Sequence, residues 1–177
     1  MSKTSSALVI AFCSLCPATR GQTPSTFGSI VEGKLTVGLL NQPPQSLERS
    51  DIARLPHKTV KVAVIGSRPS VYSGVPLKEL LEHVGAVFGS ARLEANLGSI
   101  VVVEPVDGPA VLFAMAEFDS ALTGKRILLA DRKDGKPLAA PEGPFRIIAA
   151  DEKEPARWAK QVWAIYIVQI SESARRP

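Results

Sequence analysis

The chain has 177 residues, which is enough for one domain with a hydrophobic core of its own. Its 21 Lys and Arg residues face 17 Asp and Glu residues, so the formal net charge is only +4. That small excess, with no basic stripe interleaved with aromatic residues, argues against a nucleic-acid-binding protein. No apolar run approaches membrane-spanning length, so we expect no transmembrane segment in the mature chain.

Residues 1–21 have the layout of a signal peptide. A single positive charge precedes the apolar stretch Ala7–Cys16, and the small residues Ala18 and Gly21 can each precede a cleavage point. The alternatives are a frayed apolar N-terminus and a buried core helix. Export predicts a periplasmic or secreted protein. Both cysteines, Cys13 and Cys16, lie in this leader, so the mature chain is expected to carry neither a disulfide nor a thiolate ligand.

The rest of the chain is expected to form one domain. Residues 22–33 are polar and predict a flexible lead-in, residues 34–171 the folded domain, and residues 172–177 a C-terminal tail.

The first elements follow from apolar periodicity and turn residues. They are a strand over Lys34–Leu40, a short helix over Leu47–Leu55 capped by Ser46 or Ser50, and a half-buried strand over Thr59–Ile65.

The clearest predicted helix begins at Leu77. Pro76 fixes its first turn, and apolar residues recur at i, i+3, i+4 and i+7 up to Val84. Gly85 follows, at the position where a glycine with left-handed backbone conformation commonly ends a helix.

From Ser99 onward the pattern predicts mostly strands, for a total of roughly seven strands with two or three short helices. Asp107-Gly108 and Asp134-Gly135 each predict a hairpin. The strands are Ile100–Val106, Ala110–Phe113, Lys125–Asp131, Phe145–Ala149 and Val162–Ile170, with a helical turn over Ala114–Asp119. The last strand is apolar on both sides of the pleat, which predicts a central strand covered on both faces.

The common catalytic patterns are missing. The sequence has no Gly-rich phosphate loop with the required Lys, and His57 and His83 lack the partner spacing of a zinc site. Basic residues do gather at Lys125, Arg126, Arg132, Lys133 and Lys136. This cluster is either a solvated hairpin or the rim of an anion site.

Five segments carry a resemblance to a known family. They are Tyr72–Leu77 with Leu80, Leu81 and Gly85, then Leu128–Asp131, Asp134–Leu138, Gly143–Arg146, and Arg157-Trp158. In this order they resemble the oxidoreductase molybdopterin-binding domain, the catalytic fold of sulfite oxidases and related periplasmic reductases. The resemblance covers about residues 34–170. It implies an α+β, sulfite-oxidase-like fold with a strand-rich mixed sheet, partly barrel-like, and short peripheral helices.

The chain departs from this family where the family holds its metal. Redox-active members bind molybdenum through a cysteine on the strand before the Tyr72–Leu77 segment, yet Val60–Arg68 contains none. An aliphatic side chain cannot replace that thiolate. Pro141-Glu142 stands where the family has a histidine, and Ala149-Ala150-Asp151 where it usually has a Val-Pro-Gly turn.

The resemblance therefore implies a binding or accessory domain for a small anionic, pterin-like ligand. The cofactor would be molybdopterin or another pterin, without a Cys-ligated molybdenum centre. We expect the ligand contacts to be Arg132, Arg146, Arg157 and Trp158, because guanidinium forks suit phosphate or a pterin edge and an indole offers a stacking face. We expect no metal ligand among the side chains, and replacing Arg146 with Ala to leave folding nearly unchanged.

Other interpretations remain open. Arg146 can instead be a salt-bridged strand residue and Trp158 a core anchor. The chain can also be an active molybdopterin-dependent oxidoreductase with a non-Cys metal shell and a redox partner protein, or a ligand-free structural or interaction domain. The sequence alone does not decide whether it is an enzyme.

Overall fold

The computed structural model describes residues 33–63 and 66–170. The predicted signal peptide, the lead-in up to residue 32 and the C-terminal tail lie outside these residues. None of the helices in the described part is long and apolar enough to cross a membrane.

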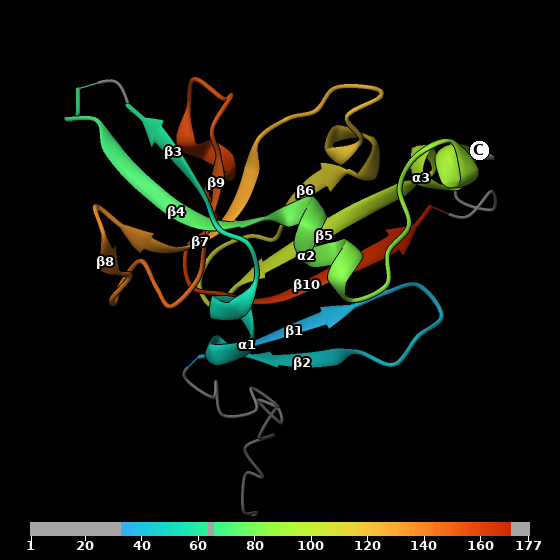
Figure 1. The fold of residues 1–177 in the computed structure, drawn as a ribbon, viewed down its shortest axis with the longest axis horizontal. Coiled ribbons are helices and arrows are strands. Elements are labelled where there is room, and N and C mark those ends of the chain that lie inside the picture. The colour runs from blue at the N-terminus through green and yellow to red at the C-terminus, as the bar shows by residue number, and fades with distance from the viewer. Residues whose placement is uncertain (1–32, 64–65, 171–177) are drawn as a thin grey trace, which may run out of the picture.

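Two five-stranded sheets form the body of the domain (Figure 1). One has the order β2 (Gln45–Glu48), β1 (Lys34–Gly38), β10 (Val162–Gln169), β5 (Ser99–Pro105) and β6 (Val111–Ala114). The other has the order β3 (Lys58–Val62), β4 (Ser70–Pro76), β7 (Ile127–Lys133) and β8 (Lys136–Pro137), with β9 (Arg146–Ala149) also paired with β7. The β1–β10 pair is parallel and the other described pairs are antiparallel.

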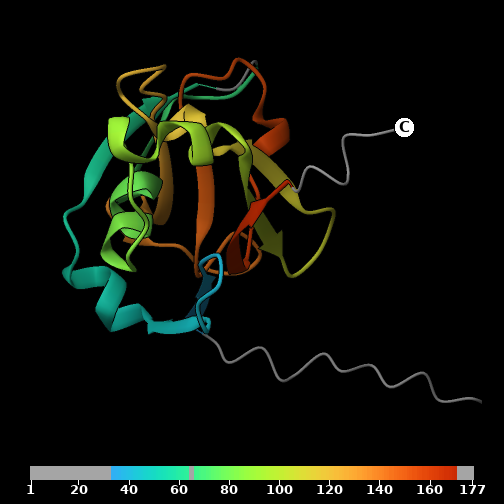
Figure 2. The same cartoon turned by 90° about the vertical axis from the view of Figure 1, so that its right-hand side faces the viewer.

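The helices are short and peripheral, as Figure 2 shows. They are α1 (Arg49–Arg54), α2 (Leu77–His83) and α3 (Leu93–Leu97), with 3₁₀ turns η1 (Ser90–Arg92), η2 (Met115–Phe118) and η3 (Pro155–Arg157). The predicted strand-rich α+β class with short helices is therefore confirmed. The expected partly barrel-like sheet is not: within residues 33–63 and 66–170 the strands form two sheets and no closed barrel.

The core lies between the sheets and beneath α2. Leu77, Leu80 and Leu81 of α2 are fully buried and belong to the same apolar cluster as Val75 and Leu129. The predicted helix is thus confirmed, with Pro76 as its N-cap and Gly85 at a positive φ of 106° beyond its end. The predicted hairpins also form, since β5 pairs with β6 and β7 pairs with β8.

The start of the domain differs from the prediction. Leu47 lies in β2 rather than in a helix, because its pairing with Leu35 of β1 buries it. Helix α1 begins only at Arg49, and neither Ser46 nor Ser50 caps it. Its N-cap is Glu48, whose backbone N–H donates to Asp51 Oδ2 at 2.9 Å.

The last strand, β10, is central as predicted, but it is not covered on both faces. Val162, Ala164 and Ile165 are buried, whereas Trp163 and Val168 are 37% and 42% exposed. One face of this sheet is therefore open to solvent along part of the strand. The prediction also missed β4, which precedes α2 directly and pairs with both β3 and β7.

Candidate functional site

Of the four predicted ligand residues three carry charge, and Arg146 is the most deeply buried of these three. It lies on β9 opposite Ala130 of β7 and is only 7% exposed. Its Nη1 donates to the Tyr72 hydroxyl at 3.2 Å and lies 2.9 Å from Glu142 Oε1. The guanidinium is thus held between a strand of the same sheet and the loop that precedes β9.

Two aromatic rings flank this guanidinium. Its central carbon lies 5.5 Å from the ring centroid of Tyr72 and 5.7 Å from that of Trp158, within the range of cation–π attraction. The two rings meet edge to face at 6.2 Å. Trp158 is buried and its indole N–H donates to the Ala149 carbonyl at 3.1 Å, so the ring orientation is fixed.

A second cation approaches the same tyrosine. Lys133 Nζ lies 5.6 Å from the Tyr72 centroid and 3.7 Å from Glu142 Oε2. Glu142 therefore bridges Lys133 and Arg146. We call these five residues (Tyr72, Lys133, Glu142, Arg146 and Trp158) the Arg146 cluster.

One donor of this cluster is not used. Arg146 Nε is buried and has no hydrogen-bond partner in the structure. A buried donor without a partner costs free energy, typically about 1–3 kcal/mol, and a charged group costs more. An anion or carbonyl oxygen placed beside it would recover that energy.

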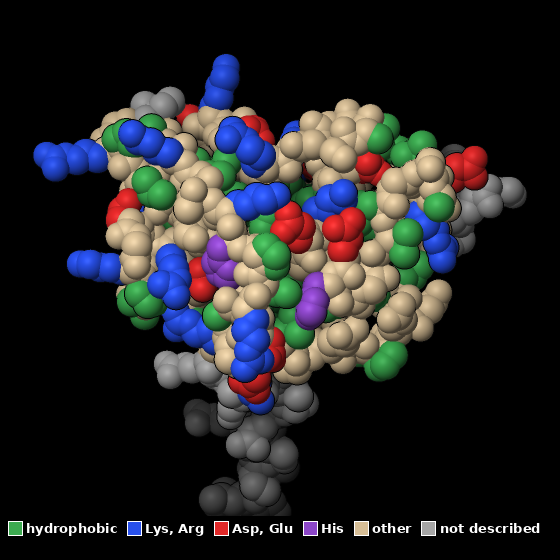
Figure 3. All heavy atoms as spheres, in the orientation of Figure 1, with side chains coloured by type: hydrophobic (Ala, Val, Ile, Leu, Met, Phe, Trp, Pro, Cys, Tyr) green, Lys and Arg blue, Asp and Glu red, His purple; other side chains and the backbone are tan. Residues whose placement is uncertain are grey.

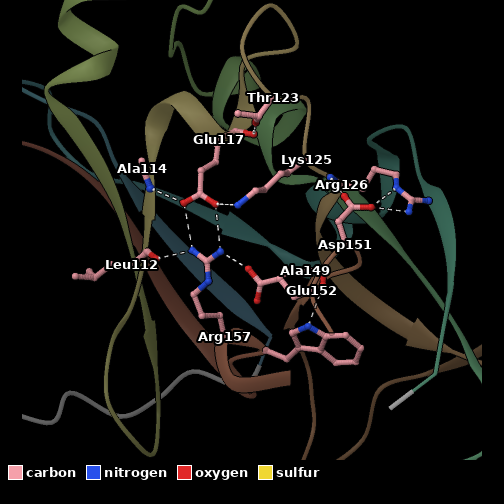
Figure 4. A network of polar contacts seen from close by, with 11 residues as sticks. Leu112, Ala114, Glu117, Thr123, Lys125, Arg126, Ala149, Asp151, Glu152 and Arg157 are labelled. Carbon is pink, nitrogen blue, oxygen red and sulfur yellow. Dashed lines mark hydrogen bonds and ion pairs between the residues drawn. The ribbon is translucent and has the colours of Figure 1, made fainter. Parts of the chain in front are cut away.

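Arg157 points into a different network, shown in Figure 4. Its guanidinium donates to both carboxylate oxygens of Glu117 at 3.2 Å and also to Glu152, and it lies 4.3 Å from the centroid of Phe113. The carboxylates of Glu117 and Glu152 raise the pKa of Arg157, and the hydrogen bonds that Arg157 donates to Glu117 contribute most. Its charge is thus balanced by two acids.

Glu117 is the centre of that network. Partial burial raises its pKa, but hydrogen bonds from Arg157, Lys125 and the Ala114 backbone outweigh burial and hold the pKa at about 2. The network connects β6, η2, η3 and the loop after β9, as expected of contacts that stabilise the fold.

Arg132 is exposed at the end of β7 and forms no ion pair with any residue from the described ranges. Of the four predicted contacts, the structure therefore brings together Arg146 and Trp158 only. The sequence did not indicate Tyr72 as part of the site, because the strand that carries it was not predicted. Basic side chains do gather over the β3, β4 and β8 side of one face, with acidic ones among them (Figure 3).

The burial of Arg146 also changes the expectation for its replacement by Ala. Removing the guanidinium leaves the Glu142 carboxylate and the buried Tyr72 hydroxyl without the cation that each of them contacts. Such losses are destabilising, so folding is not expected to remain unchanged.

A buried acid lies elsewhere on β7. Asp131 is 3% exposed, its Oδ1 lacks a hydrogen-bond partner, and His57 Nε2 lies 3.4 Å from that oxygen. Within residues 33–63 and 66–170, no group of three or more His, Cys, Asp or Glu side chains is placed to hold a metal ion.

The donor set therefore does not fit a molybdenum centre held by a protein thiolate. Both cysteines lie in the first 21 residues, and Val62 of β3 and the neighbouring Ala63 offer no donor. Arg146, by contrast, keeps one buried donor, Nε, without a hydrogen-bond partner in the structure.

No model of a known protein family and no curated protein matches the chain. Among solved structures, it is similar to the sulfane dehydrogenase SoxCD from Paracoccus pantotrophus, with 20% sequence identity and a TM-score of 0.62. The match covers 83% of this chain but 41% of that one, so the chain spans less than half the length of the dehydrogenase. At this identity the likeness shows the fold alone, and that fold agrees with the sulfite-oxidase-like architecture implied by the sequence.

Proposed function

We propose that the chain is an exported binding or accessory domain that holds a pterin-like anion at the Arg146 cluster, without a Cys-ligated molybdenum centre. The observation that carries the proposal is the buried guanidinium of Arg146, which lies between two aromatic rings and keeps Nε unpaired. The shared fold with a sulfane dehydrogenase supports it. Export, to the periplasm or the medium, rests on residues 1–21.

Two cations of the cluster, and the exposed Arg132 next to one of them in sequence, would supply contacts for such a ligand. Arg146 supplies a planar donor edge, which matches the ring nitrogen and carbonyl edge of a pterin or a phosphate oxygen. Lys133 supplies a second, more accessible positive charge. Arg132 is exposed and follows buried Asp131 on the same strand, so its contact would be with a phosphate in solvent rather than with a buried ring.

Glu142 limits the affinity of this site. Its carboxylate already occupies one face of Arg146 and approaches Lys133. A ligand anion must compete with Glu142 or displace it, so we expect the cluster to prefer a ligand that also stacks on an aromatic ring over a simple inorganic anion.

The test is the composition of the exported protein. The full chain is produced in a host that makes molybdopterin, the exported form is purified and denatured, and released pterins and bound molybdenum are quantified by mass spectrometry. We expect a pterin near one per chain and molybdenum well below that. Absence of any pterin would contradict the proposal. Molybdenum at one atom per chain would establish the metal-dependent alternative in its place.

A variant separates specific from adventitious binding. Arg146→Lys keeps the charge but loses the planar fork, so it is expected to lose at least nine-tenths of the copurifying pterin. Arg54→Lys is the matched control, because Arg54 is exposed on α1 and its ion pair with Asp51 is remote from the cluster. Equal pterin content in both variants would show that Arg146 does not contact the pterin.

Mass spectrometry of the N-terminus reports on export, and an intact Met1 in the exported fraction would contradict a cleaved leader.

A further inference from the structure

A cavity of about 710 Å³ lies where β10 begins, and none of the residues of the Arg146 cluster lines it. Its walls come from β1, β2, α1, the loop before β9 and the start of β10. The cavity falls within the range of small-molecule sites, roughly 300–1,000 Å³.

The backbone is irregular at two positions around the start of β10, and both residues line the cavity. Gln161 has a positive φ of 49°, which is uncommon for a residue other than glycine. Its backbone N–H donates to the Glu142 carbonyl at 3.1 Å, and its carbonyl accepts from Val106 N at 3.0 Å. These two hydrogen bonds hold the strained residue in place at the wall of the cavity.

Trp163 is the second irregular position. The pairing of β10 with β5 shifts between Val162 and Ala164, so Trp163 is the extra residue of a β-bulge. Bulges re-aim side chains and are common beside functional sites. The indole of Trp163 is 37% exposed and lines the cavity, in contrast to buried Trp158.

Among the described residues that line the cavity, Arg49 is a cation without an acid partner. Lys34 and Glu48 both line it and pair with each other at 2.8 Å. Arg49 also lines it and forms no ion pair with the residues that the structure describes. Ser50 and Gln161 add a hydroxyl and an amide, and Leu138 and Pro144 add apolar wall.

We propose that this Arg49–Trp163 cavity is a second binding site, for a planar aromatic molecule that carries one carboxylate or phosphate. The ring would stack on the exposed indole, and the anion would pair with the guanidinium of Arg49. Aromatic stacking and charge-assisted hydrogen bonding are the two contacts that these residues supply. The site stands apart from the pterin site proposed above and does not depend on it.

The chain provides its own reporter for a test. It has two tryptophans, so a ¹H–¹⁵N correlation spectrum of the full chain contains two indole N–H signals, one of which disappears in Trp163→Phe. Naphthoate is the anionic probe and naphthalenemethanol its neutral counterpart. We expect naphthoate to shift the Trp163 signal and leave the Trp158 signal in place, and the neutral probe to bind at least tenfold more weakly.

Two variants complete the test. Arg49→Gln is expected to weaken naphthoate binding at least tenfold, whereas Arg54→Gln, on the same helix but outside the cavity, is expected to leave it unchanged. An unperturbed Trp163 signal at saturating naphthoate, or equal affinity in the two arginine variants, would overturn the proposal. A probe that shifts only Trp158 would do the same, since it would place binding at the Arg146 cluster. Loss of pterin binding in Arg146→Lys leaves this result untouched, so the two proposals fail separately.

Discussion

Glu142 Oε1 lies 2.9 Å from Arg146 Nη1, so the buried arginine of the candidate site already has an acid beside it. Glu142 is partly exposed, while Arg146 is almost fully buried. The acid is therefore the more solvent-accessible partner of this ion pair. This arrangement makes Glu142 an internal competitor of any anion at the cluster.

Glu142→Gln is expected to strengthen binding of an aromatic anion at the Arg146 cluster. The change removes the competing charge and leaves the cationic pair Lys133 and Arg146 without a carboxylate. Because a hydrogen bond to a charged group contributes about 1.5–3 kcal/mol, affinity for 6-carboxypterin should rise about tenfold or more. Titration calorimetry measures the change.

Glu152→Gln is the control for this prediction. Glu152 also pairs with an arginine, Arg157, but belongs to the separate network around Glu117. Its replacement should leave 6-carboxypterin affinity unchanged. Affinity that falls in Glu142→Gln would show that Glu142 contributes to the ligand contact instead of competing with it.

The network around Glu117 predicts loss of stability in acid. The pKa of Glu117 is lowered from 4.5 to about 2 on folding. Because the folded pKa is the lower one, the stabilisation is complete above about pH 4.5 and disappears as the pH falls toward 2. Urea unfolding between pH 2 and 6 should show this slope.

Glu117→Gln should flatten that slope and lower the free energy of unfolding at neutral pH by about 1–3 kcal/mol. Some acid dependence will remain, because a hydrogen bond from Arg126 lowers the pKa of Asp151 and backbone hydrogen bonds, from Ala121 first, lower that of Asp119. An unchanged slope in Glu117→Gln would mean that Glu117 is not held ionised by its partners.

Much of the fold follows from local sequence signals. The apolar spacing of α2, the two Asp-Gly hairpins and the central position of β10 were all predictable, because each depends on neighbours in the chain. The split into two sheets and the place of β4 were not. Strand β4 contains Gly74 and Pro76, two residue types with low strand propensity. This segment is a strand because it pairs with β3 on one side and β7 on the other.

The site was less predictable than the fold, because side-chain direction depends on long-range packing. Arg157 and Trp158 are adjacent in sequence, yet Arg157 joins Glu117 while Trp158 turns inward to the Ala149 carbonyl. The contact between Arg146 and Tyr72 joins residues 74 positions apart. The sequence could indicate Arg146 and Trp158 through family likeness, but no local pattern places Tyr72 beside them.

The N-terminus of α1 provides a test of the corrected helix start. Asp51→Ala removes the acceptor for the Glu48 backbone N–H and the partner of Arg54. Loss of such a cap typically costs about 0.5–2 kcal/mol. Ser46→Ala, at one of the two serines that the sequence offered as a cap, should cost almost nothing because Ser46 is an exposed residue of β2. Thermal unfolding of the two variants measures both losses of stability. A larger loss of stability in Ser46→Ala would support the longer helix.

Gly74, the one glycine of β4, is expected to tolerate no larger residue without a large loss of stability. It lies at the register shift between β4 and β7, and a Cβ there would overlap the backbone of Leu129 and Ala130. Backbone atoms of a central strand cannot move aside as a flexible side chain can, so Gly74→Ala should cost roughly 3 kcal/mol or more in the free energy of unfolding. Gly135→Asn is the control, because Gly135 has open space around its missing Cβ and Asn tolerates its positive φ of 79°. Urea unfolding monitored by circular dichroism gives both values, and a Gly74→Ala variant as stable as Gly135→Asn would show that β4 and β7 are not packed as closely as the structure has them.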